Sequence, residues 1–153
     1  MNILTAINGA SEVLRKNHIK SAKLDSEILL SKIIKKDRKF IILNSNEELK
    51  NNHFTKFNEL IEKRSLGEPI AYLIGKKDFW KHEFCVSEET LIPRPDTEIL
   101  IDHILKTTKY KSKLRILDIG VGSGCIILSI LKEKKDFYGI GIDISKKCIE
   151  ISK

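Results

Sequence analysis

The chain has 153 residues, of which 41% are hydrophobic and 32% charged, which excludes a disordered protein and allows one ordinary domain or two small ones. Its formal net charge is +7, but the lysines are scattered along the chain without interleaved aromatic residues. We interpret these lysines as parts of solvated helix faces and predict no specific nucleic-acid partner. A weak electrostatic preference for RNA is the alternative. No apolar run approaches the ~20 residues that span a bilayer and no signal peptide is recognisable, so we expect a cytoplasmic protein without a membrane partner.

Three stretches near the N-terminus are rich in apolar residues. In residues 2–16 and again in residues 21–35, apolar side chains recur at helical spacing. Both stretches are therefore predicted to be amphipathic helices. Arg38–Leu43 is a shorter apolar run, and its length fits either a helix or a strand.

Residues 45–48 are Ser-Asn-Glu-Glu, the S-x-x-E pattern of a capping box. This pattern predicts a helix that starts here and ends near Ser65, with Gly67 as its C-terminal signal. Residues 1–66 are therefore expected to form a small helical bundle without a catalytic constellation of its own. Its role would be packing or, in the functional alternative, recognition of a macromolecule.

The character of the chain changes after Gly67, where aromatic residues become frequent. We expect a β-hairpin with strands near 77–80 and 83–86 that turns at Lys81-His82. This turn lacks the Gly or Asn that two-residue hairpin loops favour. The hairpin would join the helical part to a second domain.

Two prolines, Pro93 and Pro95, flank Arg94 and hold the backbone extended, because each proline fixes its own φ and restricts the residue before it. Pro95 also suits the first turn of a helix, and the acids that follow it at 96 and 98 favour the positive end of that helix. Two interpretations remain open. The segment is either a stiff helix start or a rigid loop that lines a substrate cleft, with Arg94 projecting from it.

From Leu114 the pattern is that of an α/β protein. Strands are predicted at 114–119 and 138–142, with a helix at 124–133 between them. A further helix should open at Ser145, which is a suitable N-cap.

The first predicted strand runs into a turn with glycines at every second position, from Gly120 to Gly124. Glycine has no Cβ, so a tight strand-to-helix turn can form and a ligand can lie against bare backbone. Asp143 ends the second strand, and in a Rossmann-type sheet a carboxylate there can accept hydrogen bonds from a ribose. The two features together predict a site for a nucleoside-bearing cofactor.

Other cofactors fit the sequence less well. Cys125 stands where the dinucleotide fingerprint has its third glycine, which leaves an NAD-linked dehydrogenase as a weak alternative. The P-loop pattern is absent. The three cysteines and four histidines have no metal-ligand spacing, so we predict neither a metal site nor a disulfide.

The stretch L-D-I-G-V-G-S-G at 117–124 resembles motif I of the class I S-adenosylmethionine-dependent methyltransferases, and Asp143 matches the acidic end of their second strand. Further stretches resemble one family of that class, the release-factor glutamine methyltransferases. They are G-E-P-I-A-Y-L-I-G at 67–75, F-W at 79–80, L-I-P-R-P-D-T-E at 91–98 and, more loosely, L-D-S-E-I-L-L at 24–30.

The resemblance implies an α/β fold with an all-α N-terminal bundle. It implies a helical recognition domain at 1–66, a hairpin joint at 67–92 and the start of a Rossmann-like class I methyltransferase domain at 93–153. Members of the family methylate the side-chain amide of the glutamine in the Gly-Gly-Gln motif of peptide-chain release factors. The implied cofactor is S-adenosyl-L-methionine, the implied partner is a release factor, and the full-length enzyme is expected to be a monomer.

The resemblance also assigns roles to residues. In the family the glycine turn approaches the methionine part and the adenosine of the cofactor, and the second-strand acid bonds the ribose hydroxyls. The candidate cofactor-binding residues are therefore Gly120, Val121, Gly122, Ser123, Gly124 and Asp143, with Asp118 supporting the turn. Pro93, Arg94 and Pro95 are assigned to the substrate cleft near the acceptor.

The family's acceptor motif, Asn-Pro-Pro-Tyr, does not occur in these 153 residues. In the family this motif follows the fourth strand and holds the glutamine amide with its nitrogen facing the methyl group, so no catalytic residue is assigned here. We expect a methyltransferase fold truncated after its second strand, in a chain that is inactive by itself. The alternative is a non-catalytic release-factor-binding module from a decayed or split gene.

Overall fold

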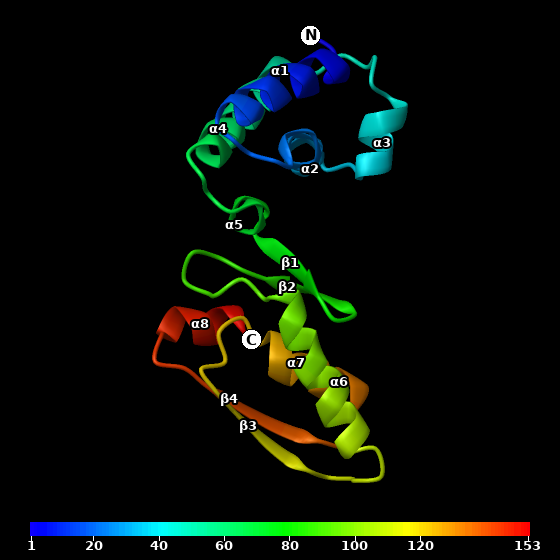
Figure 1. The fold of residues 1–153 in the computed structure, drawn as a ribbon, viewed down its shortest axis with the longest axis vertical. Helices are drawn as coiled ribbons and strands as arrows, with labels where there is room; N and C mark the ends of the chain where they lie inside the picture. Colours follow the sequence, from blue (N-terminus) through cyan, green and yellow to red (C-terminus); the bar gives the residue numbers. More distant parts are fainter. The chain divides into compact units, whose positions relative to one another are not determined.

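The computed structural model describes residues 1–153, which form two compact units, residues 1–74 and 75–153 (Figure 1). The first unit is helical, and the second combines helices with two two-stranded sheets. No helix has the length and apolar character needed to cross a membrane. The three-part division at 66 and 92 stays a prediction, because these two units reflect packing alone.

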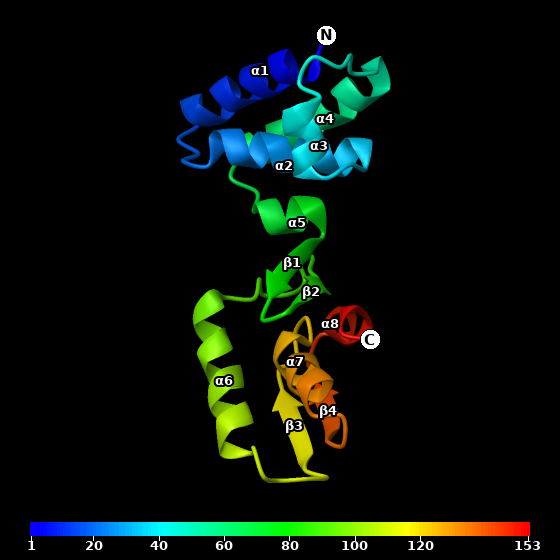
Figure 2. The same cartoon turned by 90° about the vertical axis from the view of Figure 1, so that its right-hand side faces the viewer.

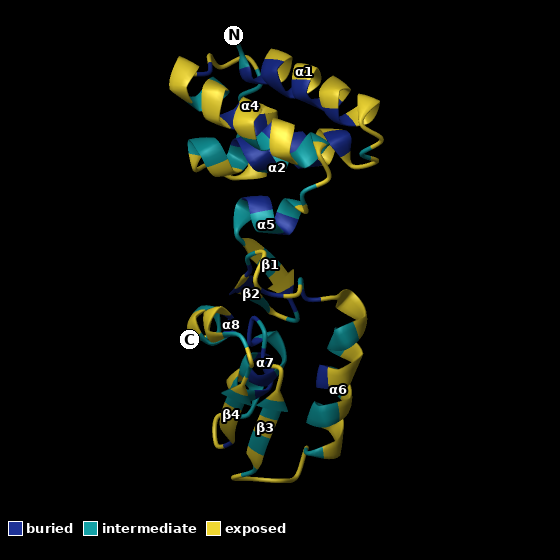
Figure 3. Ribbon diagram, turned by 90° about the vertical axis from the view of Figure 1, so that its left-hand side faces the viewer, coloured by how far each residue is buried: buried dark blue, intermediate teal, exposed yellow.

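The first unit is a bundle whose helices surround one apolar core, with exposed faces turned outward (Figure 3). The helices predicted at 2–16 and 21–35 are confirmed to within two residues at each end, and the ambiguous run before residue 44 is a helix. Asp37 caps that helix by accepting a hydrogen bond from the Phe40 amide at 2.8 Å. The elements are α1 Ile3–Lys16, α2 Ala22–Ile34, α3 Arg38–Leu43, α4 Asn51–Ser65 and α5 Ile70–Ile74.

The predicted capping box is wrong, because α4 begins only at Asn51 and the Ser45 side chain caps nothing. The segment serves α1 instead. The carbonyl oxygens of Ser45 and Glu47 accept hydrogen bonds from the amides of Leu4 and Ile3, at 2.8 and 3.0 Å. The first amides of a helix have no acceptor within the helix, so this contact from a distant segment satisfies them and overrides the local capping signal.

Side chains of α2 hold the segment that leads into α5. Asp25 is buried and accepts a hydrogen bond from Arg64 Nε at 2.8 Å, and Arg64 also donates to the Glu68 carbonyl at 3.0 Å. Lys32 Nζ donates to the Leu73 carbonyl at 2.6 Å. The stretch between these two carbonyls is therefore fixed to α2 at both of its ends. Gly67, with φ of +96°, ends the α4 region as the sequence predicted.

The second unit contains a hairpin, two helical segments that follow it, and a β-α-β unit. Its elements are β1 Lys76–Phe79, β2 His82–Cys85, η1 Pro95–Thr97, α6 Glu98–Thr107, β3 Arg115–Ile119, α7 Cys125–Glu133, β4 Tyr138–Ile142 and α8 Lys146–Ile151.

The hairpin turns one residue earlier than predicted, because Phe79 pairs with His82 and the loop is Trp80-Lys81. Trp80 has φ of +56°, a conformation that a non-glycine residue adopts only when its surroundings hold it there. Two carboxylates do so. The Trp80 amide donates to Glu98 at 2.8 Å, and its indole Nε1 donates to Glu133 at 2.9 Å.

β3 and β4 form a parallel pair joined by α7, with Asp118 opposite Gly141. The helix packs on one face of this sheet, and the opposite face lies open (Figure 3). The exposed apolar residues of this face are Leu117, Ile119, Tyr138, Ile140 and Ile142.

The ion pair between Arg64 and Asp25 gives the first prediction. Arg64→Met should lower the free energy of unfolding by about 3 kcal/mol, because it leaves a carboxylate buried without its partner. Urea denaturation of the chain followed by circular dichroism measures this. Lys76→Met is the matched control. It removes an ion pair whose two side chains are about half exposed, and it should cost about 1 kcal/mol or less. Equal losses in the two variants would contradict the prediction.

Candidate functional site

The glycine turn joins the end of β3 to the start of α7, next to the end of β4 (Figure 2). The amides of Gly120 and Val121 both donate to the Ile142 carbonyl, at 2.8 and 3.0 Å. The turn is thereby bonded to the last residue of the neighbouring strand. Gly120, Gly122 and Gly124 all have positive φ, of +83°, +54° and +77°, so all three are in the conformation that favours glycine.

These three glycines face different surroundings. A Cβ on Gly120 would meet no atom within 4 Å, and one on Gly122 would meet only the Gly120 carbonyl oxygen, at 4.0 Å. A Cβ on Gly124 would lie 2.8 Å from Leu128 Cδ1. The first two glycines therefore expose bare backbone to open space, whereas the third allows close packing against α7.

An open hollow of about 450 Å³ lies in front of Gly120, whereas Gly122 does not line it. That volume is in the range of about 300–1,000 Å³ typical of small-molecule sites. Gly120 and Asp143 line it, together with three isoleucines from the two strand ends, Ile119, Ile142 and Ile144. Val121 and Ser123 are buried inside the turn and do not line the hollow.

Asp143 has a fixed carboxylate. Its Oδ1 accepts a hydrogen bond from the Ser145 amide and its Oδ2 accepts one from the Gly122 amide, both at 2.9 Å. These backbone donors, that of Ser145 first, lower the pKa of the Asp143 carboxyl and keep it ionised. Each oxygen retains acceptor capacity, so a hydroxyl-bearing ligand in the hollow can still bind to it.

Asp118 is the second-last residue of β3, two positions before Gly120, and is partly buried. Burial raises the pKa of its carboxyl, and the charge of Asp143 raises it further, against the opposing effect of the Ile127 amide. Its Oδ2 atom is buried and has no hydrogen-bond partner. Unpaired buried carboxylate oxygens are rare in folded proteins, which marks this atom as a point where a donor group is missing.

The predicted cleft residues lie apart from the hollow, since none of them lines it. Pro95 opens η1, which confirms the predicted helix start, and Pro93 is buried. Arg94 is exposed, its backbone is extended, and its side chain forms no hydrogen bond or ion pair. Its assignment to a substrate cleft stays a prediction.

Sequence reasoning missed the side chains that connect these parts. Glu89, Lys147 and Cys148 link the loop after the hairpin to α8, and Glu98 binds the Trp80 amide. Only Glu98 lies in a stretch with a recognisable motif. The hydrogen bond from Cys148 is accepted by the backbone carbonyl of Glu89, and a backbone carbonyl gives no signal in the sequence.

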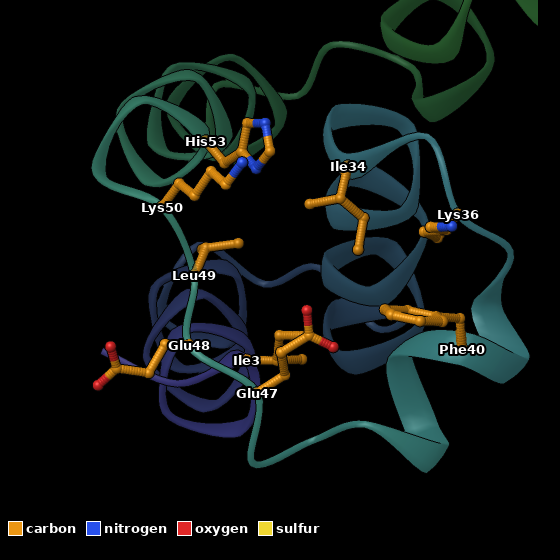
Figure 4. A pocket seen from close by; sticks show the side chains of 9 residues that line it. All are labelled: Ile3, Ile34, Lys36, Phe40, Glu47, Glu48, Leu49, Lys50 and His53. Carbon is orange, nitrogen blue, oxygen red and sulfur yellow. The ribbon is translucent and has the colours of Figure 1, made fainter.

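The first unit has a pocket of its own between α1, α2, α3 and the start of α4 (Figure 4). Its volume is about 190 Å³, and its apolar base includes Ile3 and Leu49. Lys50 and His53 lie side by side at one side of it, whereas Glu48 points away (Figure 4). The absence of a catalytic constellation from the bundle stays a prediction.

Known proteins resemble this chain along its whole length. A family model described as the PrmC N-terminal domain matches residues 5–75. The release factor glutamine methyltransferase of Buchnera aphidicola subsp. Acyrthosiphon pisum is 42% identical over 153 residues, which cover 100% of this chain and 54% of that protein. Proteins of the same name from Buchnera aphidicola subsp. Schizaphis graminum and Caulobacter vibrioides are 44% and 31% identical, over 90% and 100% of this chain and 50% and 53% of their own lengths. The chain thus spans about half the length of the curated relatives it matches.

Gly141 tests how tightly the turn packs on β4. In Gly141→Ala the new Cβ would lie 2.7 Å from Cγ2 and 3.1 Å from Cβ of Val121, so the free energy of unfolding should fall by about 1–2 kcal/mol. Gly9→Ala is the control. A Cβ at this exposed position of α1 meets nothing within 4 Å, and stability should rise by about 0.5–1 kcal/mol. Urea denaturation measures both changes, and a tolerated Gly141→Ala would contradict the close packing.

Asp118 should make stability depend on pH. Because its pKa is raised in the folded state, its ionisation destabilises the fold above that pKa, and this destabilisation disappears as the pH falls to about 3.9, the value of an unperturbed Asp. The free energy of unfolding of Asp118→Asn should therefore exceed that of the unmodified chain at pH 7, and this difference should shrink as the pH falls to 4. Urea denaturation at several pH values measures the difference, and a constant difference would argue against the raised pKa.

Proposed function

This chain belongs to the release factor glutamine methyltransferase family, and on that premise we propose that its protein methylates the glutamine side-chain amide in the Gly-Gly-Gln motif of peptide-chain release factors, with S-adenosyl-L-methionine as the methyl donor. The names of the three relatives support the reaction and the release factor as partner. Because the chain spans about half of their length, the proposal concerns the activity of the whole protein. The observation that carries it is the bare glycine backbone beside the fixed carboxylate of Asp143.

The residues of the turn suit S-adenosylmethionine. Gly120 and Gly122 leave open the space that a ligand would occupy against the backbone, and the hollow has the volume of a small-molecule site. We assign the free acceptor capacity of Asp143 to the ribose hydroxyls. The unpaired Oδ2 of Asp118 would accept from a donor group of the methionine part, directly or through water. When bound, the cofactor supplies a methyl group on a positively charged sulfur.

The fold around the turn suits the same proposal. β3, α7 and β4 form a parallel β-α-β unit with the ligand-facing turn at the carboxyl end of the first strand, the arrangement with which nucleotide-binding Rossmann-like sheets begin. We therefore interpret this unit as the start of a class I methyltransferase domain. The apolar face of its sheet matches the expectation that such a sheet is covered on both faces.

On the acceptor side we assign Pro93, Arg94 and Pro95 to the substrate cleft. The Arg94 guanidinium has no partner within the chain, so all of its N–H groups are available to carbonyl or carboxylate oxygens of an incoming peptide. The prolines would keep the loop rigid, so that less conformational entropy is lost when the peptide binds. These 153 residues contain no Asn-Pro-Pro-Tyr motif, and we assign none of the catalytic positioning to them.

Calorimetry with S-adenosylmethionine, S-adenosylhomocysteine and NAD tests the cofactor site. The first two should bind and NAD should not. Asp143→Ala should weaken binding by about 1–3 kcal/mol, the loss expected for hydrogen bonds to a charged group. Asp136→Ala is the matched control, because Asp136 also accepts a backbone amide at 2.9 Å but does not line the hollow. The affinity of Asp136→Ala for S-adenosylmethionine should equal that of the unmodified chain.

Two results would contradict the proposal: NAD binding in preference to S-adenosylmethionine, and equal affinities for Asp143→Ala and the unmodified chain. A second assay follows a labelled methyl group from the cofactor to a release factor. Transfer by this chain would overturn the view that these 153 residues do not position the glutamine amide. Binding of the release factor without transfer would favour the non-catalytic binding module.

A further inference from the structure

The loop between β2 and η1 begins with a turn formed by residues 87–90, and this turn is attached to α8. The Thr90 amide donates to the Ser87 carbonyl at 3.0 Å, which closes the turn. The Glu89 carbonyl at its tip accepts a hydrogen bond from Cys148 Sγ at 3.0 Å. The Glu89 carboxylate also pairs with Lys147.

The chain that follows this loop is attached to the hairpin. Glu98, the first residue of α6, accepts a hydrogen bond from the Trp80 amide at 2.8 Å. Between Glu89 and Glu98 stands Arg94, whose side chain has no partner. The segment from Glu89 to Glu98 is therefore fixed at both ends, and the free guanidinium of Arg94 lies between these two points.

The start of α8 is in turn built on the candidate cofactor site. Asp143 bonds the amides of Gly122 and Ser145, both at 2.9 Å, and the Ser145 hydroxyl accepts a hydrogen bond from the Cys148 amide at 3.3 Å. A continuous series of hydrogen bonds thus runs from the glycine turn through Asp143, Ser145 and Cys148 to the Glu89 carbonyl.

We propose that Cys148 is a positioning residue that couples the cofactor site to the acceptor loop, here defined as residues 87–94. This inference rests on the proposed function, in which the cofactor binds at Asp143 and the substrate peptide binds at the loop. By holding the Glu89 carbonyl, the thiol fixes where Arg94 stands relative to Asp143. Cofactor that binds to Asp143 stabilises this series of hydrogen bonds further, and with it the loop that receives the peptide, so the two ligands bind cooperatively.

The two contacts of Glu89 do not contribute equally. Its ion pair with Lys147 joins side chains that are 43% and 67% exposed, and such pairs contribute little in water. Cys148 is buried, so its hydrogen bond is shielded from solvent competition. The coupling therefore depends on the thiol. If Cys148 served only as a small packing residue, an apolar side chain of similar size would replace it without loss.

Residue-resolved amide hydrogen exchange of the 153-residue chain, without ligand, tests the coupling. Cys148→Val keeps the volume but removes the donor, and exchange at the Thr90 amide should rise by roughly 2- to 10-fold, the ratio that corresponds to one net hydrogen bond. Cys148→Ser keeps a donor and should restore slow exchange. Cys85→Val is the matched control, because Cys85 is exposed and its thiol forms no hydrogen bond.

A reciprocal variant tests the series without altering Cys148. Asp143→Ala should also raise exchange at the Thr90 amide, although Asp143 does not contact the loop. The inference is overturned if Cys148→Val and Cys85→Val exchange alike at Thr90, if Cys148→Ser behaves as Cys148→Val, or if Asp143→Ala leaves Thr90 unchanged.

S-adenosylhomocysteine separates this inference from the proposed function. In the unmodified chain the ligand should slow exchange both at the Gly122 amide and at the Thr90 amide. In Cys148→Val the slowing should be confined to Gly122. Failure of the ligand to bind would refute the proposed cofactor, while the ligand-free exchange of Cys148→Val and Asp143→Ala would still decide the coupling. Slowing at Gly122 alone in the unmodified chain would refute the coupling and leave the cofactor site intact.

Discussion

The second unit depends on one carboxylate that bonds two amides from different segments. Asp143 joins the glycine turn to the residue that caps α8, and both bonds are 2.9 Å long. A two-stranded parallel sheet is only marginally stable by itself, so hydrogen bonds at the carboxyl end of its strands contribute more to its stability than they would in a larger sheet. The same contact fixes the orientation of the only acidic group that lines the hollow. Asp143 therefore has a structural role as well as the ligand-binding role that we propose for it.

Much of the fold could be predicted from the sequence because the signals are local. Helical spacing located α1 and α2, Ser145 capped α8 as expected, and Pro95 opened the helical segment before α6. The glycine turn was recognisable because three positive φ values within five residues require glycine at fixed spacing. The candidate site rests on signals of the same local kind, since the groups that we propose to face a ligand are the backbone of the turn and the carboxylate of Asp143 after β4.

What the sequence could not reveal depends on contacts between distant residues. Ser45 has a capping motif, yet its carbonyl serves α1, because the exposed amides of that helix compete for the same segment. The hairpin turns at Trp80 against local preference, because Glu98 and Glu133 hold it. The stretch L-D-S-E-I-L-L at 24–30, which resembles the family, has a structural role, since the Asp25 carboxylate forms the buried ion pair with Arg64. A motif shared with a family thus need not belong to its active site.

Trp80 is the only tryptophan of the chain, and its place has a practical consequence. Its indole is hydrogen-bonded to Glu133 at the end of α7, so its emission depends on the packing of residues 75–153. The helices of residues 1–74 contain no tryptophan. Tryptophan fluorescence therefore observes the unit with the glycine turn alone, while far-ultraviolet ellipticity sums both units. Comparing the two optical signals during denaturation would reveal whether the units lose their structure together or in sequence.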